Sequence, residues 1–294
     1  MKINFNDKNI LMKIHFVLLC IIFVGCNKKE PTLVLPNEEI ILTEVSYGTH
    51  EHQKMDVYLP KNRSKATKTI IYLHGGGWYM GDKSDIKDGA IYFQQQGFAF
   101  ISINYRLTRT PENNIHPAQM QDIDRVIAFI NQKQQEWSLP DDKLALFGGS
   151  AGAHLSLLYA YKYQVNGKVK AAISMSGPTD LTDNLLINST IGGASIGAMI
   201  ESYVGAPFTA QAAAWQATSP ISFITATSVP TLFVHGTIDS AVPYQQSLSA
   251  YNKLKNAGGV AQLEPLPNIG HDLVGTNWGD LLPKMIDFLN QHVK

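Results

Sequence analysis

Short apolar runs alternate along the chain with longer stretches whose apolar residues recur every three or four positions. The short runs predict eight strands, at residues 40–45, 54–58, 69–73, 99–104, 144–147, 171–174, 231–234 and 262–266. Several runs are apolar without interruption, as in Ile70-Ile71-Tyr72-Leu73. Uninterrupted runs of this length are typical of strands buried on both faces of a parallel sheet.

Helical spacing is clearest within residues 117–135, where five apolar side chains share one face: Met120, Ile123, Val126, Ile127 and Ile130. The same pattern predicts helices at 151–161, 244–256 and 280–292. Strands and helices that alternate in units of about 30 residues are typical of parallel sheets with right-handed crossovers. We therefore expect an α/β fold, with a mostly parallel eight-stranded sheet flanked by helices.

One segment departs from this alternation. Residues 181–219 are rich in glycine and alanine, including Gly192-Gly193 and Ala212-Ala213-Ala214. We interpret 181–219 as a small cap-like insertion over the sheet, within a single domain at 40–294. The alternative is a plain helical crossover that touches no substrate.

The chain before this domain has the pattern of a targeting segment. Residues 16–24 form an apolar run after Lys13, too short for a bilayer span of about 20 residues. The run fits the apolar core of a secretory signal. Translation from Met12 instead of Met1 would also produce such a signal.

The end of the run, Phe23-Val24-Gly25-Cys26, resembles a bacterial lipobox, although Phe23 stands where leucine is usual. The resemblance implies a lipoprotein signal peptide at 1–25 and lipidation of Cys26. Residues 26–39 are polar and contain two prolines, as a tether would. We expect an exported protein, lipid-anchored in the bacterial cell envelope. The alternative is an ordinary cleaved signal with a coincidental cysteine.

Composition and charge limit the classes of binding partner that are expected. The 294 residues are 45% hydrophobic, and 24 basic residues balance 24 acidic ones. Without residues 1–25, 21 basic and 23 acidic residues leave a formal charge of −2. Nucleic-acid binding needs a basic excess, so no nucleic-acid partner is expected, and membrane contact is expected only through lipid on Cys26. Cys20 and Cys26 both precede the fold, so no disulfide forms inside it. The oligomeric state is left open.

Gly148-Gly149-Ser150-Ala151-Gly152 has the form G-x-S-x-G and lies between a predicted strand and a predicted helix. A nucleophilic serine at such a turn sits on a strained backbone, which requires small neighbours. Ser150 is thus a candidate nucleophile above the carboxyl edge of the sheet. The backbone N–H of Ala151, at the helix start, would point at a developing oxyanion. The alternative is a structural glycine-rich turn.

His74-Gly75-Gly76-Gly77-Trp78 follows the predicted strand at 69–73. Consecutive glycines leave backbone N–H groups accessible, so Gly76 and Gly77 are candidates for the other half of an oxyanion hole, although Gly75 is not separable from them. A mobile loop is the alternative. A phosphate-binding loop is excluded because Trp78, and not a Lys-Ser/Thr pair, directly follows the glycines.

A nucleophilic serine needs a base, and the base needs an orienting acid. Asp239 follows the strand at 231–234, and His271 follows the last predicted strand. Asp272 is a second candidate acid, but it is adjacent to His271 in the chain, so its side chain points elsewhere. The order Ser150…Asp239…His271 is that of the α/β-hydrolases.

Together these motifs resemble α/β-hydrolases of the carboxylesterase group that includes bacterial feruloyl-esterase-like and hormone-sensitive-lipase-like enzymes. Segments 55–60 and 104–107, and Pro117 and Asp122, extend the resemblance from about Val45 to the C-terminus. It implies a serine carboxylesterase of small-molecule or polysaccharide esters with short acyl, aryl, acetyl or feruloyl groups. An acyl-enzyme would form on Ser150, and neither a metal nor another cofactor is implied.

Two other classes compete with an esterase. An arylformamidase, another amidase or a peptidase would use the same fold, and arylformamidases resemble this chain around residues 74–78. A non-catalytic binding lipoprotein is the remaining alternative, although such proteins typically lose a member of the triad.

The other histidines and two aromatic residues have simpler interpretations. His50 and His52 have the spacing of a metal site, but they lie far from the other motifs. We expect His154 to be packed inside the domain, and His74 and His235 to shape loops. His116 is a candidate for the pocket wall. Trp78 and Tyr105 either border the pocket or belong to the core.

Overall fold

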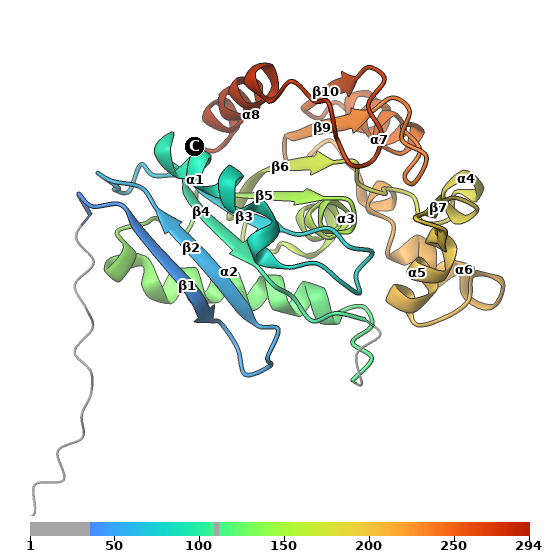
Figure 1. The fold of residues 1–294 in the computed structure, drawn as a ribbon, viewed down its shortest axis with the longest axis horizontal. Coiled ribbons are helices and arrows are strands. Elements are labelled where there is room, and N and C mark those ends of the chain that lie inside the picture. The colour runs from blue at the N-terminus through green and yellow to red at the C-terminus, as the bar shows by residue number, and fades with distance from the viewer. Residues whose placement is uncertain (1–35, 109–111) are drawn as a thin grey trace, which may run out of the picture. The chain divides into compact units, whose positions relative to one another are not determined.

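An eight-stranded sheet organises the computed structural model, which describes residues 36–108 and 112–294 (Figure 1). The strand order is β1-β2-β4-β3-β5-β6-β9-β10. Both β1–β2 and β2–β4 are antiparallel, and the other neighbours are parallel. The strands are β1 (Ile40–Ser46), β2 (Lys54–Leu59), β3 (Thr69–Leu73), β4 (Ala99–Ile103), β5 (Leu144–Gly149), β6 (Val169–Met175), β9 (Thr231–Gly236) and β10 (Ala261–Leu266).

Helices cover both faces of this sheet. They are α1 (Lys87–Gln95), α2 (Ala118–Trp137), α3 (Ala151–Leu158), α7 (Gln245–Asn256) and α8 (Trp278–His292). The apolar residues of α2, α3 and α7 pack on one face, and those of α1 and α8 pack on the other. Strand β3 shows why its apolar run is uninterrupted: Ile71 and Leu73 point to the first face, whereas Ile70 and Tyr72 point to the second. The predicted fold class is confirmed.

The cap-like insertion lies between β6 and β9 and has its own secondary structure. It contains α4 (Asn184–Ile187), a hairpin of β7 (Thr190–Ile191) and β8 (Ala194–Ser195), α5 (Ile196–Val204) and α6 (Phe208–Ala217). Its buried side chains, among them Ile200, Tyr203 and Trp215, belong to the same apolar cluster as α2 and α3. The insertion is therefore packed onto the main core.

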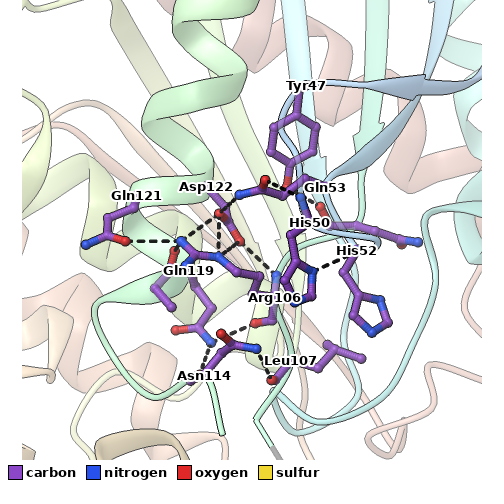
Figure 2. Close-up of polar contacts among 12 residues, drawn as sticks. Tyr47, His50, His52, Gln53, Arg106, Leu107, Asn114, Gln119, Gln121 and Asp122 are labelled. Atoms are coloured by element: carbon purple, nitrogen blue, oxygen red, sulfur yellow. Dashed lines mark hydrogen bonds and ion pairs between the residues drawn. The ribbon is translucent and has the colours of Figure 1, made fainter. Parts of the chain in front are cut away.

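A buried ion pair joins the segment after β4 to α2. Asp122 is fully buried, and one of its carboxylate oxygens lies 2.9 Å from the terminal guanidinium nitrogen Nη2 of Arg106. The backbone N–H of Arg106 and the amide of Gln53 also donate to Asp122, at 2.8 and 2.7 Å (Figure 2). Arg106 and Asp122 belong to two different motifs of the sequence, and this contact fastens the strand end to the helix that follows it.

The predicted signal peptide at 1–25 lies outside the described residues, as do residues 26–35 of the predicted tether. The last part of that tether contacts the domain, because Arg63 donates its backbone N–H to Pro36 O and its guanidinium to Glu38 O. Within 36–108 and 112–294, no helix has both the length and the apolar character needed to cross a membrane.

Candidate active site

Ser150 occupies a sharp turn between β5 and α3. Its backbone has φ 51° and ψ −120°, a conformation that non-glycine residues rarely adopt. The turn also brings α3 against β3, so that a Cβ on Gly152 would lie 2.0 Å from Leu73 O. A side chain at position 152 is therefore excluded, which explains the last glycine of the G-x-S-x-G motif.

Asp239 and His271 meet because two loops at the carboxyl edge of the sheet are joined backbone to backbone. Ile238 N donates to Ile269 O at 3.1 Å. The approach is so close that a Cβ on Gly236 would lie 2.3 Å from the same carbonyl oxygen. The glycine that ends β9 thus permits the acid loop and the base loop to touch.

The three residues predicted for the triad form a continuous chain of contacts. Ser150 Oγ lies 3.0 Å from His271 Nε2, and His271 Nδ1 lies 2.7 Å from Asp239 Oδ2. The Asp239 side chain is fully buried, whereas that of His271 is 15% exposed. This geometry allows a proton to pass from the serine hydroxyl to a histidine whose other nitrogen faces a carboxylate.

The Asp239 carboxylate accepts hydrogen bonds on both oxygens. Its Oδ1 accepts the backbone N–H groups of Ala241 and Val242, at 3.0 and 2.9 Å. Burial by itself raises the pKa of the Asp239 carboxyl, but hydrogen bonds from His235 and His271, the charge of His271 and the Val242 N–H together hold that pKa well below its ordinary value. Asp239 is therefore ionised at neutral pH. Asp272 does not compete, because its carboxylate accepts the N–H of Val274.

The predicted oxyanion donors surround the serine. Gly76, Gly77 and Ala151 line the same cavity as Ser150 and His271, and Gly75 does not. Within the described residues, no recorded hydrogen bond uses the backbone N–H of these three residues. Their N–H groups remain available for a ligand oxygen.

The cavity beside Ser150 measures about 320 Å³ and is mainly apolar. Its walls come from the glycine loop, from the insertion and from two other loops: Trp78, Tyr79, Met80, Pro178, Ile191, Gly192, Ile196, Met199 and Val242. Among the residues that the structure describes, no Asp, Glu, Lys or Arg side chain lines it. Because four of these residues belong to the insertion, that segment forms a wall of the cavity rather than a remote crossover.

Trp78 and Tyr105 have different positions. Trp78 is almost fully buried yet borders the cavity, where its ring stacks on Tyr203 of the insertion with centroids 5.0 Å apart. Tyr105 belongs to the core, and its hydroxyl donates to His74 O at 2.9 Å. Trp78 thus connects the cavity to the core beneath it.

The other histidines in the part of the chain that the structure describes lie outside the cavity. His154 is packed as expected, accepting from Trp78 Nε1 at 3.2 Å and donating to Thr218 O at 2.8 Å. His116, a candidate for the pocket wall, contacts the hydroxyls of Tyr163 and Tyr203 and does not line the cavity. In 36–108 and 112–294, no three His, Cys, Asp or Glu side chains are grouped as metal ligands.

Sequence reasoning missed one contact of the site. His235 Nε2 lies 3.2 Å from Asp239 Oδ2, so a second histidine touches the carboxylate. The spacing His235-Gly236-Thr237-Ile238-Asp239 is the signal that could have shown it, because a tight turn after a strand brings such residues together.

The fold and the site together define the class of protein. A serine on a strand-to-helix turn, a histidine after the last strand and a buried aspartate between them form the arrangement of a serine hydrolase on the α/β-hydrolase fold. More narrowly, the chain belongs to the BD-FAE family, whose model matches residues 55–254.

Several known proteins with similar sequences bear hydrolase names. Kynurenine formamidase of Danio rerio is 27% identical over 259 residues, which cover 83% of this chain and 80% of that protein. The probable carboxylic ester hydrolase LipM of Mycobacterium tuberculosis is 26% identical over 72% of this chain and 51% of its own length. Among solved structures, a truncated carbohydrate esterase from gut microbiota superposes with a TM-score of 0.72 at 24% identity, covering 87% of this chain and 97% of that one.

Proposed function

We propose that the protein is a serine hydrolase that cleaves carboxylic esters through an acyl-enzyme. The observation that carries this proposal is the chain of contacts Ser150–His271–Asp239 beside three unused backbone N–H donors. Family membership and the relative named as a carboxylic ester hydrolase support the same reaction.

The geometry assigns a step to each group. His271 Nε2 accepts the proton of Ser150 Oγ as that oxygen bonds to the ester carbonyl carbon, and the carbonyl oxygen becomes an oxyanion. The N–H groups of Gly76, Gly77 and Ala151 donate to that oxyanion, and the loss of one such donor typically costs about 3 kcal/mol of activation free energy. Asp239 keeps His271 Nδ1 protonated and stabilises the imidazolium.

The tetrahedral intermediate then collapses. The carbon–oxygen bond to the alcohol breaks, and the alcohol leaves with the proton that His271 Nε2 carries. Water attacks the resulting Ser150 ester while His271 accepts its proton, and the acid is released as Ser150 recovers a proton. No step requires a metal or an organic cofactor.

The cavity supports esters whose group beside the carbonyl is uncharged and compact. A charged acyl group would lose hydration against the apolar walls without gaining an ion pair. We propose short acyl and aryl esters as substrates, including acetyl and feruloyl esters on polysaccharides.

A formamidase is the second candidate. It is favoured by a similarity to kynurenine formamidase that extends over 83% of the chain. The same groups would attack an N-formyl carbon, with an arylamine as leaving group instead of an alcohol. The cavity would accept the formyl group as readily as an acetyl group.

One panel of substrates distinguishes the esterase, the formamidase and the non-catalytic binding protein. The purified domain and its Ser150→Ala variant are assayed with p-nitrophenyl acetate, p-nitrophenyl octanoate, methyl ferulate, acetylated xylan and N-formylkynurenine. We expect ester turnover that falls to background in Ser150→Ala. Preferential cleavage of N-formylkynurenine would favour the formamidase. A folded protein that turns over none of them would favour the non-catalytic binding lipoprotein.

We also propose that Cys26 carries a lipid that anchors the protein in the cell envelope, which rests on the lipobox-like residues 23–26. Radiolabelled palmitate fed to expressing cells should enter the full chain and not its Cys26→Ser variant. An unlabelled, secreted full chain would contradict the anchor.

A further inference from the structure

A second histidine lies against the carboxylate of the triad. His235 is the last residue but one of β9, and its side chain is fully buried, as is that of Asp239. The His235 Nε2 atom lies 3.2 Å from Asp239 Oδ2, the oxygen that also faces His271 Nδ1. Asp239 Oδ2 therefore lies between two imidazoles.

The hydrogen bonds of His235 define its tautomer. Nε2 lies 2.8 Å from the carbonyl oxygen of Val242, which only accepts, so Nε2 carries a proton. Nδ1 lies 2.7 Å from Ser247 Oγ and accepts the hydroxyl proton in the neutral ring. The neutral form satisfies both nitrogens.

Other groups around His235 do not change this assignment. The Tyr244 ring meets the imidazole edge-on, with centroids 5.9 Å apart and planes at 86°. Within the described residues, Asp239 and Tyr244 are the ionisable side chains recorded in contact with His235. The His235 Nε2 proton thus lies between Val242 O at 2.8 Å and, at the longer distance of 3.2 Å from the same nitrogen, Asp239 Oδ2.

We propose that His235 is a positioning residue for the triad, holding Asp239 Oδ2 toward His271 through its Nε2 proton. This inference rests on the proposed function. The N–H groups of Ala241 and Val242 hold only Oδ1, so His235 is the second side chain, besides His271, that the described residues bring within reach of Oδ2. As a donor to the carboxylate, His235 also lowers the basicity of Oδ2.

Loss of the His235 donor therefore has two effects. The carboxylate is held less firmly, which lowers kcat more than it changes KM, because the substrate does not touch His235. The carboxylate also becomes more basic and stabilises the protonated form of His271 further. The acid limb of the kcat/KM profile then moves to higher pH.

The test compares His235→Leu, which removes the donor, with His235→Gln, whose amide N–H can reach the same atoms. We expect His235→Leu to lower kcat roughly 10- to 100-fold, the range seen when hydrogen-bonded supports of metal-binding histidines are removed. KM should change less than about twofold, and the acid limb should rise by roughly half a pH unit. His235→Gln should restore most of kcat. His154→Gln, a change at another buried histidine, should leave the acid limb in place.

Proton NMR makes the test independent of turnover. The proton between His271 Nδ1 and Asp239 Oδ2, which lie 2.7 Å apart, is expected to resonate at low field, and its resonance should shift further downfield in His235→Leu as Oδ2 becomes more basic. Should His235→Leu fail to fold, Ser247→Ala, which removes the hydroxyl that fixes the tautomer, should show the same displacements to a smaller extent.

Two results would overturn the inference. One is a folded His235→Leu with the wild-type kcat, acid limb and low-field resonance. The other is a His235→Gln variant whose kcat is as low as that of His235→Leu, while the acid limb of the kcat/KM profile stays in place in both variants. The His235 ring would then contribute only to packing. A wild-type protein without hydrolytic activity would contradict the proposed function instead, while the NMR comparison would still decide the role of His235.

Discussion

Replacing Asp239 by asparagine tests how the acid controls the base. Oδ1 of Asp239 accepts two backbone N–H groups, from Ala241 and Val242. An asparagine must keep its carbonyl oxygen at that position to satisfy them. Its NH₂ group then takes the place of Oδ2 and faces His271 Nδ1, 2.7 Å away in the wild type.

The consequence for catalysis follows from the tautomer. An NH₂ donor obliges His271 Nδ1 to accept, so the ring proton moves to Nε2, where Ser150 Oγ lies 3.0 Å away. A protonated Nε2 cannot accept the serine proton. In a serine protease, the same replacement lowers kcat about 10⁴-fold, or about 5 kcal/mol of activation free energy, and we expect a similar loss here. The NH₂ group also opposes the Nε2 proton of His235, which should lower the free energy of unfolding by about 1–3 kcal/mol.

The assay is steady-state hydrolysis of p-nitrophenyl acetate near pH 8, with urea denaturation of the same preparations. Ser150→Ala defines the background rate. A folded Asp239→Asn that keeps more than a tenth of the wild-type kcat would refute the argument, since the base would then work without an acceptor at Nδ1.

Two further predictions concern stability. Asp122→Ala leaves the buried end of Arg106 without its partner and should lower the free energy of unfolding by about 3–5 kcal/mol in denaturant titrations. Glu136→Ala, which breaks a more exposed pair with Lys133, should cost less than about 1 kcal/mol, and equal losses in the two variants would contradict this reasoning. Burial lowers the pKa of His154 to about 3, so below pH 6.5 the unfolded chain binds a proton that the folded one does not. Protonation of His154 in the unfolded chain should therefore lower the free energy of unfolding by about 2 kcal/mol between pH 8 and 5. If the free energy of unfolding of a His154→Gln variant fell equally steeply, His154 would be excluded as the cause.

The strands of the sheet were predictable because burial on both faces leaves a local signature. Each central strand is an apolar run. Because parallel strands all end at the same edge of the sheet, the turn residues that follow them lie together at its carboxyl edge. Helix α1 escaped prediction because it buries little: Ala90, Phe93 and Gln94 are its buried residues, too few for a clear helical pattern.

The shape of the insertion was less predictable. Its small residues are compatible with several packing arrangements, and the amino-acid composition does not determine which of them forms. The helix that brings Met199 to the cavity depends on apolar contacts with the main core, and the exposed hairpin that brings Ile191 there directly precedes that helix. Those contacts form between segments distant in sequence, which no local pattern describes.

The sequence by itself determined the order of the eight strands in the chain, the strained turn at Ser150 and the loops that carry Asp239 and His271, because each depends on residues adjacent in the chain. The tertiary structure alone decided which groups touch: the carboxylate held between His235 and His271, and the pairing of Arg106 with Asp122. The reason is that hydrophobic patterning specifies which face of an element is buried, whereas a hydrogen bond requires atoms to approach within about 3 Å. Such precision comes only from strand register and from loops packed against each other.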